Sequence, residues 1–417
     1  MRVGHARFCL SPRDTTFYLI GYRSEKRKNP AEGIHDDIYC NSLLLEIGQE
    51  QLFIFSADFL EWEDEMAEEI KSMLSDKFGI NRDLVLVCAT HNHSSVMSYH
   101  KHWHTGVFDS EYYEFVMDTV VKSYEECLGS LTETTVRAGS QIITGYYSNR
   151  NHPGQLADNE VSVVQFINKD GVPICGLVNW AVHATILGPN NNKLTGDLPG
   201  QVCQKLGKYW GYYPAFIVGA AADCSNRNDR QGDDFAELER VSTGLAEAIA
   251  SIPLTNELKF GDIHYETLCH TIHHDMREVH EDALKFIQKV EEDKLDPNST
   301  VAKMPLSALI NKCKSILEVP DYHLDIKFSV IHLGDVQIVT FPGELGSRFG
   351  IELKQGIPEF GMIAGYSNGF HHYFLPREEY GLSFETIGNP VPKGEPEKIV
   401  EKMMQSSMLL SNRYGIH

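Results

Sequence analysis

The sequence lacks the features that mark several common classes of protein. Its nine cysteines are widely spaced and none forms a Cys-x-x-Cys pair, which excludes a zinc ribbon and a disulfide framework. It contains no run of about 20 apolar residues, so no transmembrane segment is predicted. The first residues, MRVGHARFCLSPRD, lack the apolar core of a signal peptide. We therefore expect reduced thiols and a cytoplasmic location.

Basic side chains are also scarce. Lysine and arginine total 37 against 58 aspartates and glutamates, so the net charge is −21 at pH 7. A surface this acidic repels phosphate groups, which argues against nucleic acid and anionic membranes as partners. The sequence also has no glycine-rich phosphate loop and no Gly-x-Ser-x-Gly elbow of a serine hydrolase. We therefore expect a small-molecule substrate, and a homo-oligomer stays an open alternative.

What the sequence does contain is an alternation of apolar runs and amphipathic patterns over 417 residues, which predicts an α/β protein. Strands are predicted over 42–47, 51–56, 84–89, 161–167, 175–182, 215–222, 328–333, 336–341 and 362–366. Helices are predicted over 62–78, 111–128, 234–249 and 395–410. The stretch 271–317 is helical by pattern with a break at Pro297, so we interpret it as a helical insertion in a single domain of 1–417.

Five of the predicted strands end in polar clusters. In chain order, these clusters contain His91 and His93, His183, Ser225 and Asn226, Glu344, and finally Asn368 and His371. Ligands of open α/β sheets bind beyond the strand ends, where loops display side chains that the strands hold rigid. If several of these strands are parallel neighbours, their clusters meet in one pocket.

The residue types in these clusters suit a zinc ion. His91, His183 and Glu344 supply two imidazole nitrogens and one carboxylate oxygen, which are ligands that Zn²⁺ accepts. A catalytic zinc site needs about three or four protein ligands and one position for a water, whose pKa falls to roughly 7. Each residue alone is ordinary, because a histidine after a strand is more often structural and Pro-Gly-Glu is a common turn. The zinc interpretation therefore depends on these residues meeting at neighbouring strand ends.

Two alternatives for the histidines stay open. His91 and His93 share one side of an extended chain, so both could bind one ion. His100, His102 and His104 could form a second metal site, although a substrate-facing loop or a plain polar loop is the better interpretation.

The same residues lie in five ordered stretches, 90–95, 181–200, 222–227, 342–348 and 368–380. These are similar to the HTHSGP, AVHxTSMNN…LISGDNKG, GDVSPN, PGEFTT…GRR and NxYxxYxxTxEEY motifs of one family. The sequence therefore resembles the catalytic domain of the neutral (non-lysosomal) ceramidase family.

This resemblance implies a mononuclear zinc amidase of lipid metabolism, with a mixed β-sheet sandwich and flanking helices. The ligands it implies are His91, His183, Glu344 and Tyr373. It places His93 beside the metal as an acid/base or substrate contact, Arg150 near the scissile bond and Ser225 against the substrate. From the same stretches we assign Asn226, Asn368 and His371 to substrate binding.

The chain also departs from the family. Ser-Gly-Pro after the His-x-His is lost, GDVSPN becomes ADCSNR at 222–227, and Phe384 or Glu385 replaces a tyrosine expected to stabilise the oxyanion. Family members are secreted or membrane-associated and carry a C-terminal immunoglobulin-like domain, whereas this chain ends after the catalytic domain. We therefore expect an N-acyl substrate smaller or more soluble than ceramide. The alternatives are a zinc enzyme acting on an ester or glycosyl derivative, and a non-catalytic binding protein.

Overall fold

Strand β2 (Tyr39–Ile47) shows how the sequence builds a layered fold. Leu44 points to one face of the strand, Leu43 and Leu45 point to the other, and all three are buried. Leu44 joins a core with helices, while Leu43 and Leu45 join a separate core between two sheets. A sheet that buries both faces needs a covering layer on each side.

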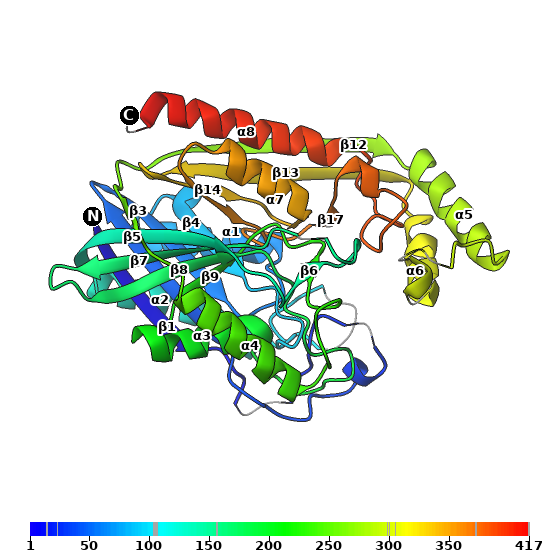
Figure 1. The fold of residues 1–417 in the computed structure, drawn as a ribbon, viewed down its shortest axis with the longest axis horizontal. Helices are drawn as coiled ribbons and strands as arrows, with labels where there is room; N and C mark the ends of the chain where they lie inside the picture. Colours follow the sequence, from blue (N-terminus) through cyan, green and yellow to red (C-terminus); the bar gives the residue numbers. More distant parts are fainter. Residues whose placement is uncertain are drawn as a thin grey trace.

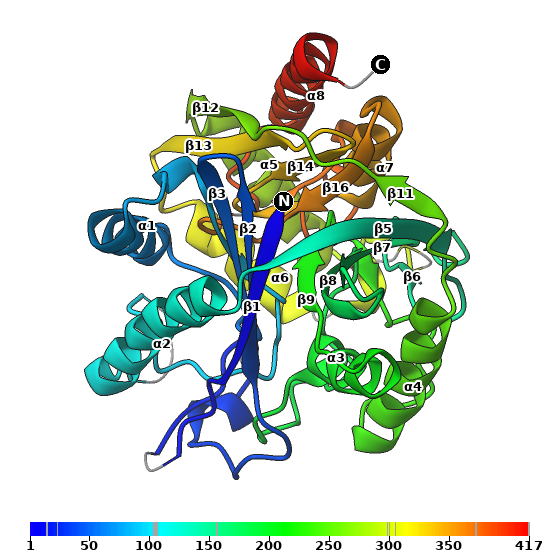
Figure 2. The same cartoon turned by 90° about the vertical axis from the view of Figure 1, so that its left-hand side faces the viewer.

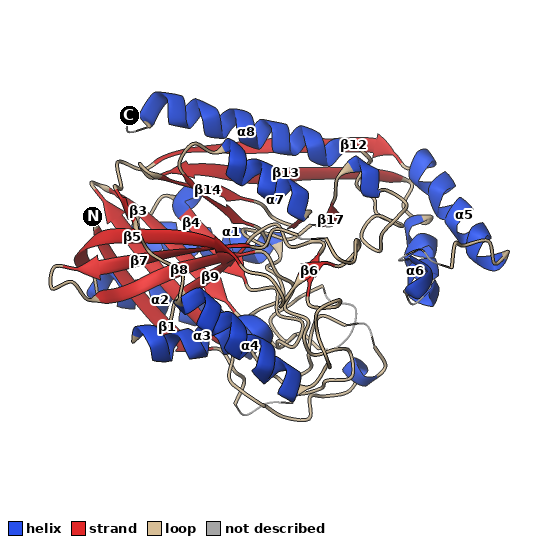
Figure 3. Ribbon diagram, viewed as in Figure 1, coloured by secondary structure: helices blue, strands red, loops and turns tan. Residues whose placement is uncertain are grey.

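The structure is a computed structural model, and it describes residues 1–13, 16–22, 24–102, 107–155, 157–297, 299, 301–304, 306–371 and 373–415. Two sheets lie between two sets of helices (Figure 1 and Figure 3). The first sheet has nine strands in the order β4-β3-β2-β1-β5-β7-β8-β9, with β11 paired to β5. Its other strands are β1 (Arg2–Cys9), β3 (Glu50–Ala57), β4 (Val85–Ala89), β5 (Thr132–Ile142), β7 (Glu160–Asn168), β8 (Pro173–Trp180), β9 (Ala215–Val218) and β11 (Asn256–Leu258). The pairs β3–β4 and β8–β9 are parallel, and the other pairs are antiparallel.

Four helices cover the outer face of this sheet. They are α1 (Asp64–Phe78), α2 (Ser110–Gly129), α3 (Asp197–Trp210) and α4 (Phe235–Ala250). Helices α1 and α2 lie beside β1–β4, and α3 and α4 lie beside β8 and β9 (Figure 2). The side chains of Asp109 and Asp234 accept N–H groups of the first turns of α2 and α4, which fixes where these helices begin.

The second sheet has four strands in the order β12-β13-β14-β16. They are β12 (His264–Asp275), β13 (Asp321–His332), β14 (Val336–Thr340) and β16 (Phe360–Ala364), and only β14–β16 is a parallel pair. Ile338 joins the core between the two sheets, whereas Phe328 and Val339 join the core with α7 (Ser347–Gly356) and α8 (Glu395–Tyr414). The layers are therefore helix, sheet, sheet, helix, which confirms the expected sandwich with flanking helices.

The helical insertion lies at the far end of β12 and β13 (Figure 1). It contains α5 (Arg277–Glu291), a 3₁₀ turn at Val301–Lys303, and α6 (Leu306–Ile316). It begins later than predicted, because residues 271–275 continue β12. In that segment buried His270 and Ile272 alternate with exposed Thr271 and His273, which is the period of a strand. The single-domain organisation stays a prediction.

All nine cysteines are free and most are buried, as expected for small apolar side chains. Every predicted strand overlaps a strand of the structure, although β9 ends at Val218 rather than Ala222. Among the described helices, none combines the length and the apolar character that crossing a membrane requires.

Candidate active site

The loops that follow the strand ends of both sheets meet and are joined through their backbones. The N–H of Ala89, at the end of β4, donates to the carbonyl of Tyr366, just after β16, at 3.1 Å. Similar bonds run from His93 to Ala184 and from Ala222 to Leu345. His91, Tyr366 and Asn368, all in these loops, have positive φ angles of 56°, 52° and 61°. Strained backbone of this kind is typical of functional sites.

The three histidines present the same nitrogen to one another. Each ring places Nδ1 at hydrogen-bond distance from a backbone carbonyl, so Nδ1 carries the proton and Nε2 has a free lone pair. The acceptors are Leu60 for His91 (3.0 Å), Gly21 for His93 (3.0 Å) and Ala221 for His183 (2.7 Å). Burial lowers the pKa of all three rings well below the usual value, so they are neutral.

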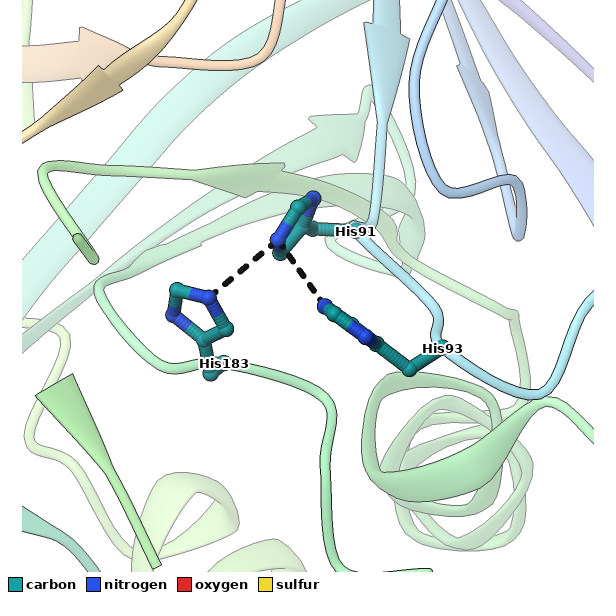
Figure 4. Close-up of side chains that lie close together, drawn as sticks. All are labelled: His91, His93 and His183. Atoms are coloured by element: carbon teal, nitrogen blue, oxygen red, sulfur yellow. Dashed lines mark hydrogen bonds between the residues drawn. The ribbon is translucent and has the colours of Figure 1, made fainter. Parts of the chain in front are cut away.

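These lone pairs converge (Figure 4). Nε2 of His91 lies 3.2 Å from Nε2 of His183 and 3.1 Å from Nε2 of His93. Unprotonated nitrogens at this distance repel one another unless a cation lies between them. Ligand atoms of a tetrahedral zinc ion with bonds of 2.0–2.1 Å are about 3.3 Å apart. The cluster therefore fits a metal ion.

Glu344 adds a carboxylate to this cluster. It begins β15 (Glu344–Leu345), and its Oε2 lies 3.2 Å from Nε2 of His183 and 3.6 Å from Nε2 of His91. The Tyr366 hydroxyl donates to the same oxygen at 3.1 Å. Burial raises the pKa of Glu344, against the opposing effect of His91 and Arg150. A cation at the cluster would stabilise the ionised carboxylate.

Tyr373 lies next to Glu344. It begins β17 (Tyr373–Phe374), which pairs with β15 so that Tyr373 is the register partner of Glu344. Burial, and then the Glu344 charge, raises the pKa of its hydroxyl. The structure thus brings all four expected ligands to one place, and Tyr366, which the sequence analysis did not select, is the second phenol there. Its position just after the strand β16 is the sequence feature that could have identified it.

Arg150 forms an ion pair with a buried carboxylate. It follows β6 (Ser148–Asn149), which pairs with β10 (Cys224–Ser225). Its Nε donates to Oε1 of Glu385 at 2.6 Å, and Asn151 donates to Oε2 at 3.0 Å. Burial raises the pKa of Glu385, but the Arg150 charge and these hydrogen bonds outweigh it and lower the pKa overall. Which of Phe384 and Glu385 takes the place of the family tyrosine stays a prediction, and Glu385 is the one that contacts Arg150.

A lysine of the insertion reaches the same region. Lys312 of α6 donates from Nζ to the carbonyls of Phe384 (2.8 Å) and Glu385 (3.2 Å). Its ammonium also lies 5.8 Å from the ring centroid of Tyr373. Burial lowers its pKa to about 8, although the Glu385 charge opposes this. No strand-end pattern points to a lysine on a distant helix, so the sequence analysis missed it.

The remaining expected site residues differ in whether their polar atoms already have partners within the protein. Ser225 accepts the N–H of Arg227 at 3.2 Å, and Asn226 donates to a backbone carbonyl but leaves its buried Oδ1 without a partner. Asn368 accepts the Val87 N–H at 2.9 Å, which fastens its loop to β4. His371 lies 3.5 Å from the Asp64 carboxylate at the start of α1. Their roles in substrate binding stay predictions.

The described histidines of the second group lie against carboxylates. His100 lies 2.9 Å from the Glu61 carboxylate and 3.3 Å from that of Glu63, and His102 lies 3.8 Å from Glu63. His104, the third member, lies outside the described residues. In the described part of the chain, the only cluster with the geometry of a metal site is His91, His93 and His183.

Two solved structures with a similar fold are ceramidases. A ceramidase complexed with C2 is 16% identical with a TM-score of 0.75, and the match covers 100% of this chain and 76% of that chain. The neutral ceramidase from Pseudomonas aeruginosa is 17% identical with a TM-score of 0.75, and the match covers 100% of this chain and 75% of that chain. No curated protein matches the sequence.

Residues 13–209 match the family model described as "Neutral/alkaline non-lysosomal ceramidase, N-terminal". The resemblance is thus confirmed: residues 13–209 match the model of the neutral ceramidase family, and the whole chain has the fold of the solved ceramidases. This similarity supports a hydrolase that acts on amide bonds.

Proposed function

We propose that this protein is a zinc-dependent amidase that cleaves N-acyl bonds. The observation that carries the proposal is the convergence of Nε2 of His91 and His183 with Oε2 of Glu344, within 3.2–3.6 Å of one another. Tyr373 is the fourth ligand of the proposed set. When bound, the ion would supply Lewis acidity and a water of lowered pKa.

His93 is the proposed proton-transfer residue. It is the only one of the three histidines that is partly exposed, and its Nδ1–H donates to the Gly21 carbonyl. A neutral ring held in this tautomer can accept a proton at Nε2 and return it to the departing amine. Its Nε2 already faces that of His91, so no large movement is needed.

Arg150 and Asn226 are the proposed partners of the substrate amide. Arg150 stabilises negative charge that develops on the carbonyl oxygen, and Glu385 fixes the orientation of its guanidinium. The unpartnered Oδ1 of Asn226 is available to a donor of the substrate. Ser225 stays next to it as a further contact.

The proposed substrate is smaller or more soluble than ceramide, because the chain departs from the family at 222–227 and at Glu385. Cleavage of an ester or glycosyl derivative, and binding without catalysis, are the competing functions. A cytoplasmic location also stays a proposal.

Metal content and turnover test the proposal on one preparation. We expect about one zinc per chain by elemental analysis, and release of hexanoate from short N-hexanoyl amides. Glu344→Gln should lose metal and turnover with its circular dichroism unchanged. The matched control is Glu401→Gln, which removes the same charge from the exposed face of α8 and should change neither. Absence of any stoichiometric transition metal after growth with added zinc would contradict the proposal.

A further inference from the structure

The partly exposed side of the histidine cluster is formed by Tyr22. Its ring centroid lies 5.1 Å from that of His93, and both residues are partly exposed. The Tyr22 hydroxyl donates to the Leu187 carbonyl at 3.1 Å, which fixes the ring against the loop after His183. Tyr22 therefore borders the partly exposed face of His93.

Three arginines surround Tyr22. The guanidinium of Arg27 lies 5.3 Å from the Tyr22 ring centroid, and the charges of Arg27, Arg230 and Arg227 all act on the Tyr22 hydroxyl. Together they oppose the larger effect of burial, which raises the pKa of that hydroxyl. Arg227 follows Cys224 by three residues, and the Cys224 carbonyl accepts the His183 N–H at 3.0 Å, so its loop begins beside the metal cluster; its charge also acts on His183.

Two of these arginines are fixed by neutral partners. Arg27 is 1% exposed and donates to the Ile20 carbonyl (3.2 Å) and the Ser94 hydroxyl (3.4 Å), while its buried Nε has no partner. Arg230 donates from one nitrogen to the carbonyls of Thr185 and Ile186, each at 3.1 Å. Both side chains hold loops of the site, and neither charge is neutralised by its partners.

The third arginine is free. Arg227 is exposed, and its guanidinium makes no hydrogen bond or ion pair with any residue that the structure describes. It stands in the stretch where the family motif GDVSPN has asparagine, so its charge is a departure from the family. Its backbone N–H donates to Ser225, which orients it beside the site.

The described carboxylates near these three arginines do not pair with them. None of the three arginines forms an ion pair with a carboxylate in the described ranges, although Arg150 close by is paired with Glu385. Asp197, whose charge acts on both Tyr22 and Arg27, has its pKa raised to about 7 by burial, so it is partly protonated at neutral pH. These arginines therefore keep unpaired positive charge, although Asp229, Asp233 and Asp234 stand in the same loop as Arg227 and Arg230.

We propose that these arginines bind an anionic group of the substrate, so that the substrates are N-acyl amines with a carboxylate or a similar anion on the amine portion. The anion belongs to the amine portion because Tyr22 packs on His93, the residue proposed to protonate the departing amine. Arg227 makes the direct contact, and Arg27 and Arg230 supply a fixed positive field behind it. The inference rests on the proposed amidase function and names its substrate class.

Three probes of similar size test the inference. N-hexanoylglycine carries the anion on the amine side, N-hexanoylglycinamide is its neutral counterpart, and the mono-ethylamide of adipate carries the anion on the acyl side. Release of the amine, followed by chromatography, gives kcat/KM for each. We expect N-hexanoylglycine to exceed both other probes by about tenfold. Equal or lower kcat/KM for N-hexanoylglycine overturns the inference, and a preference for the adipate probe overturns the placement on the amine side.

Variants of Arg227 test whether this arginine causes the preference for N-hexanoylglycine. Arg227→Asn, which restores the family residue, should lower the ratio of kcat/KM for the first two probes about tenfold, mainly through KM. Arg227→Lys should retain most of the ratio, and the control Arg413→Gln, an exposed charge on α8, should retain all of it. An unchanged ratio in Arg227→Asn contradicts the inference.

The same probes separate this inference from the proposed function. If no probe is hydrolysed, calorimetry on the zinc-loaded protein still measures their binding. Tighter binding of N-hexanoylglycine that Arg227→Asn abolishes would support the anion site and reject the amidase. Turnover of all probes without preference would support the amidase and reject the anion site.

Discussion

The two sheets contribute opposite kinds of side chain to the site. The loops of the nine-stranded sheet supply His91, His93 and His183, which are neutral and held by backbone carbonyls. The part of the chain from α6 onward supplies both carboxylates and a lysine, with Glu344, Glu385 and Lys312 all buried or partly buried. The histidine side could hold a cation that relieves repulsion between lone pairs, and the other side provides a carboxylate that would offset the charge of that cation.

The buried acids show the same contrast. Asp58, at the end of β3, accepts the Tyr39 N–H and the Thr90 hydroxyl but has no cationic partner. Burial raises its pKa to about 7. Glu385 is equally buried, yet Arg150 holds its pKa below the usual value. The negative charge of Asp58 is thus suppressed, whereas that of Glu385 is maintained by pairing with Arg150.

The largest effect on turnover is expected from substitutions of the histidines, which can separate metal binding from proton transfer. His91→Ala should lose both metal and turnover, because His91 is central to the cluster. His93→Ala should keep the metal and lose about 10²–10⁴-fold in kcat, the usual contribution of a positioned acid or base. Zinc content and turnover measured on the same preparations decide this. Equal metal loss in the two variants would make both residues ligands.

Breaking the ion pair of the charged side should affect stability. Glu385→Gln leaves Arg150 buried without a counter-charge, which costs about 3–5 kcal/mol in the free energy of unfolding. Denaturant unfolding measures it. The double variant Arg150→Met/Glu385→Leu should lose less, because it leaves no unpaired charge. A loss below about 1 kcal/mol in Glu385→Gln would show that the pair contributes little.

A substitution of Lys312 tests whether the helical insertion contributes to the site. Lys312→Met leaves two carbonyls near the site without a donor, so we expect a loss of about 1–3 kcal/mol in the free energy of unfolding and about tenfold in kcat/KM. Lys314→Met is the matched control, since Lys314 lies on the same helix and is exposed. Equal kinetics in the two variants would make the insertion irrelevant to the site.

The smallest effect concerns Asp58 and the pH dependence of stability. Its folded pKa of about 7 exceeds the ordinary value of 3.8, so the folded protein binds this proton more tightly than the unfolded chain. Its contribution to stability is therefore full below about pH 4 and is lost as the pH rises through about 7. Asp58→Asn should reduce the difference in melting temperature between pH 5 and pH 8. An unchanged difference would show that Asp58 titrates normally.

The sequence predicted the parts of the site that depend on local pattern. Apolar runs located the strands, and the polar residues after them, His91, His183 and Glu344, are brought together as expected. The pattern failed where packing overrides local preference. Helix α3 contains Pro199, Gly200 and Gly207, so no helix was predicted there, yet Leu198, Val202 and Leu206 bury one face of it. Lys312 was beyond reach because only the docking of α6 brings it to Tyr373.

The backbone bonds between the strand-end loops determine when the site can form during folding. His91 and Glu344 belong to different sheets, and their loops meet only after the core between the sheets has closed. Contacts between residues so distant in the sequence form late and slowly. The ion is thus expected to enter an already folded protein and to stabilise it by mass action, rather than to nucleate its folding as zinc does in small finger domains.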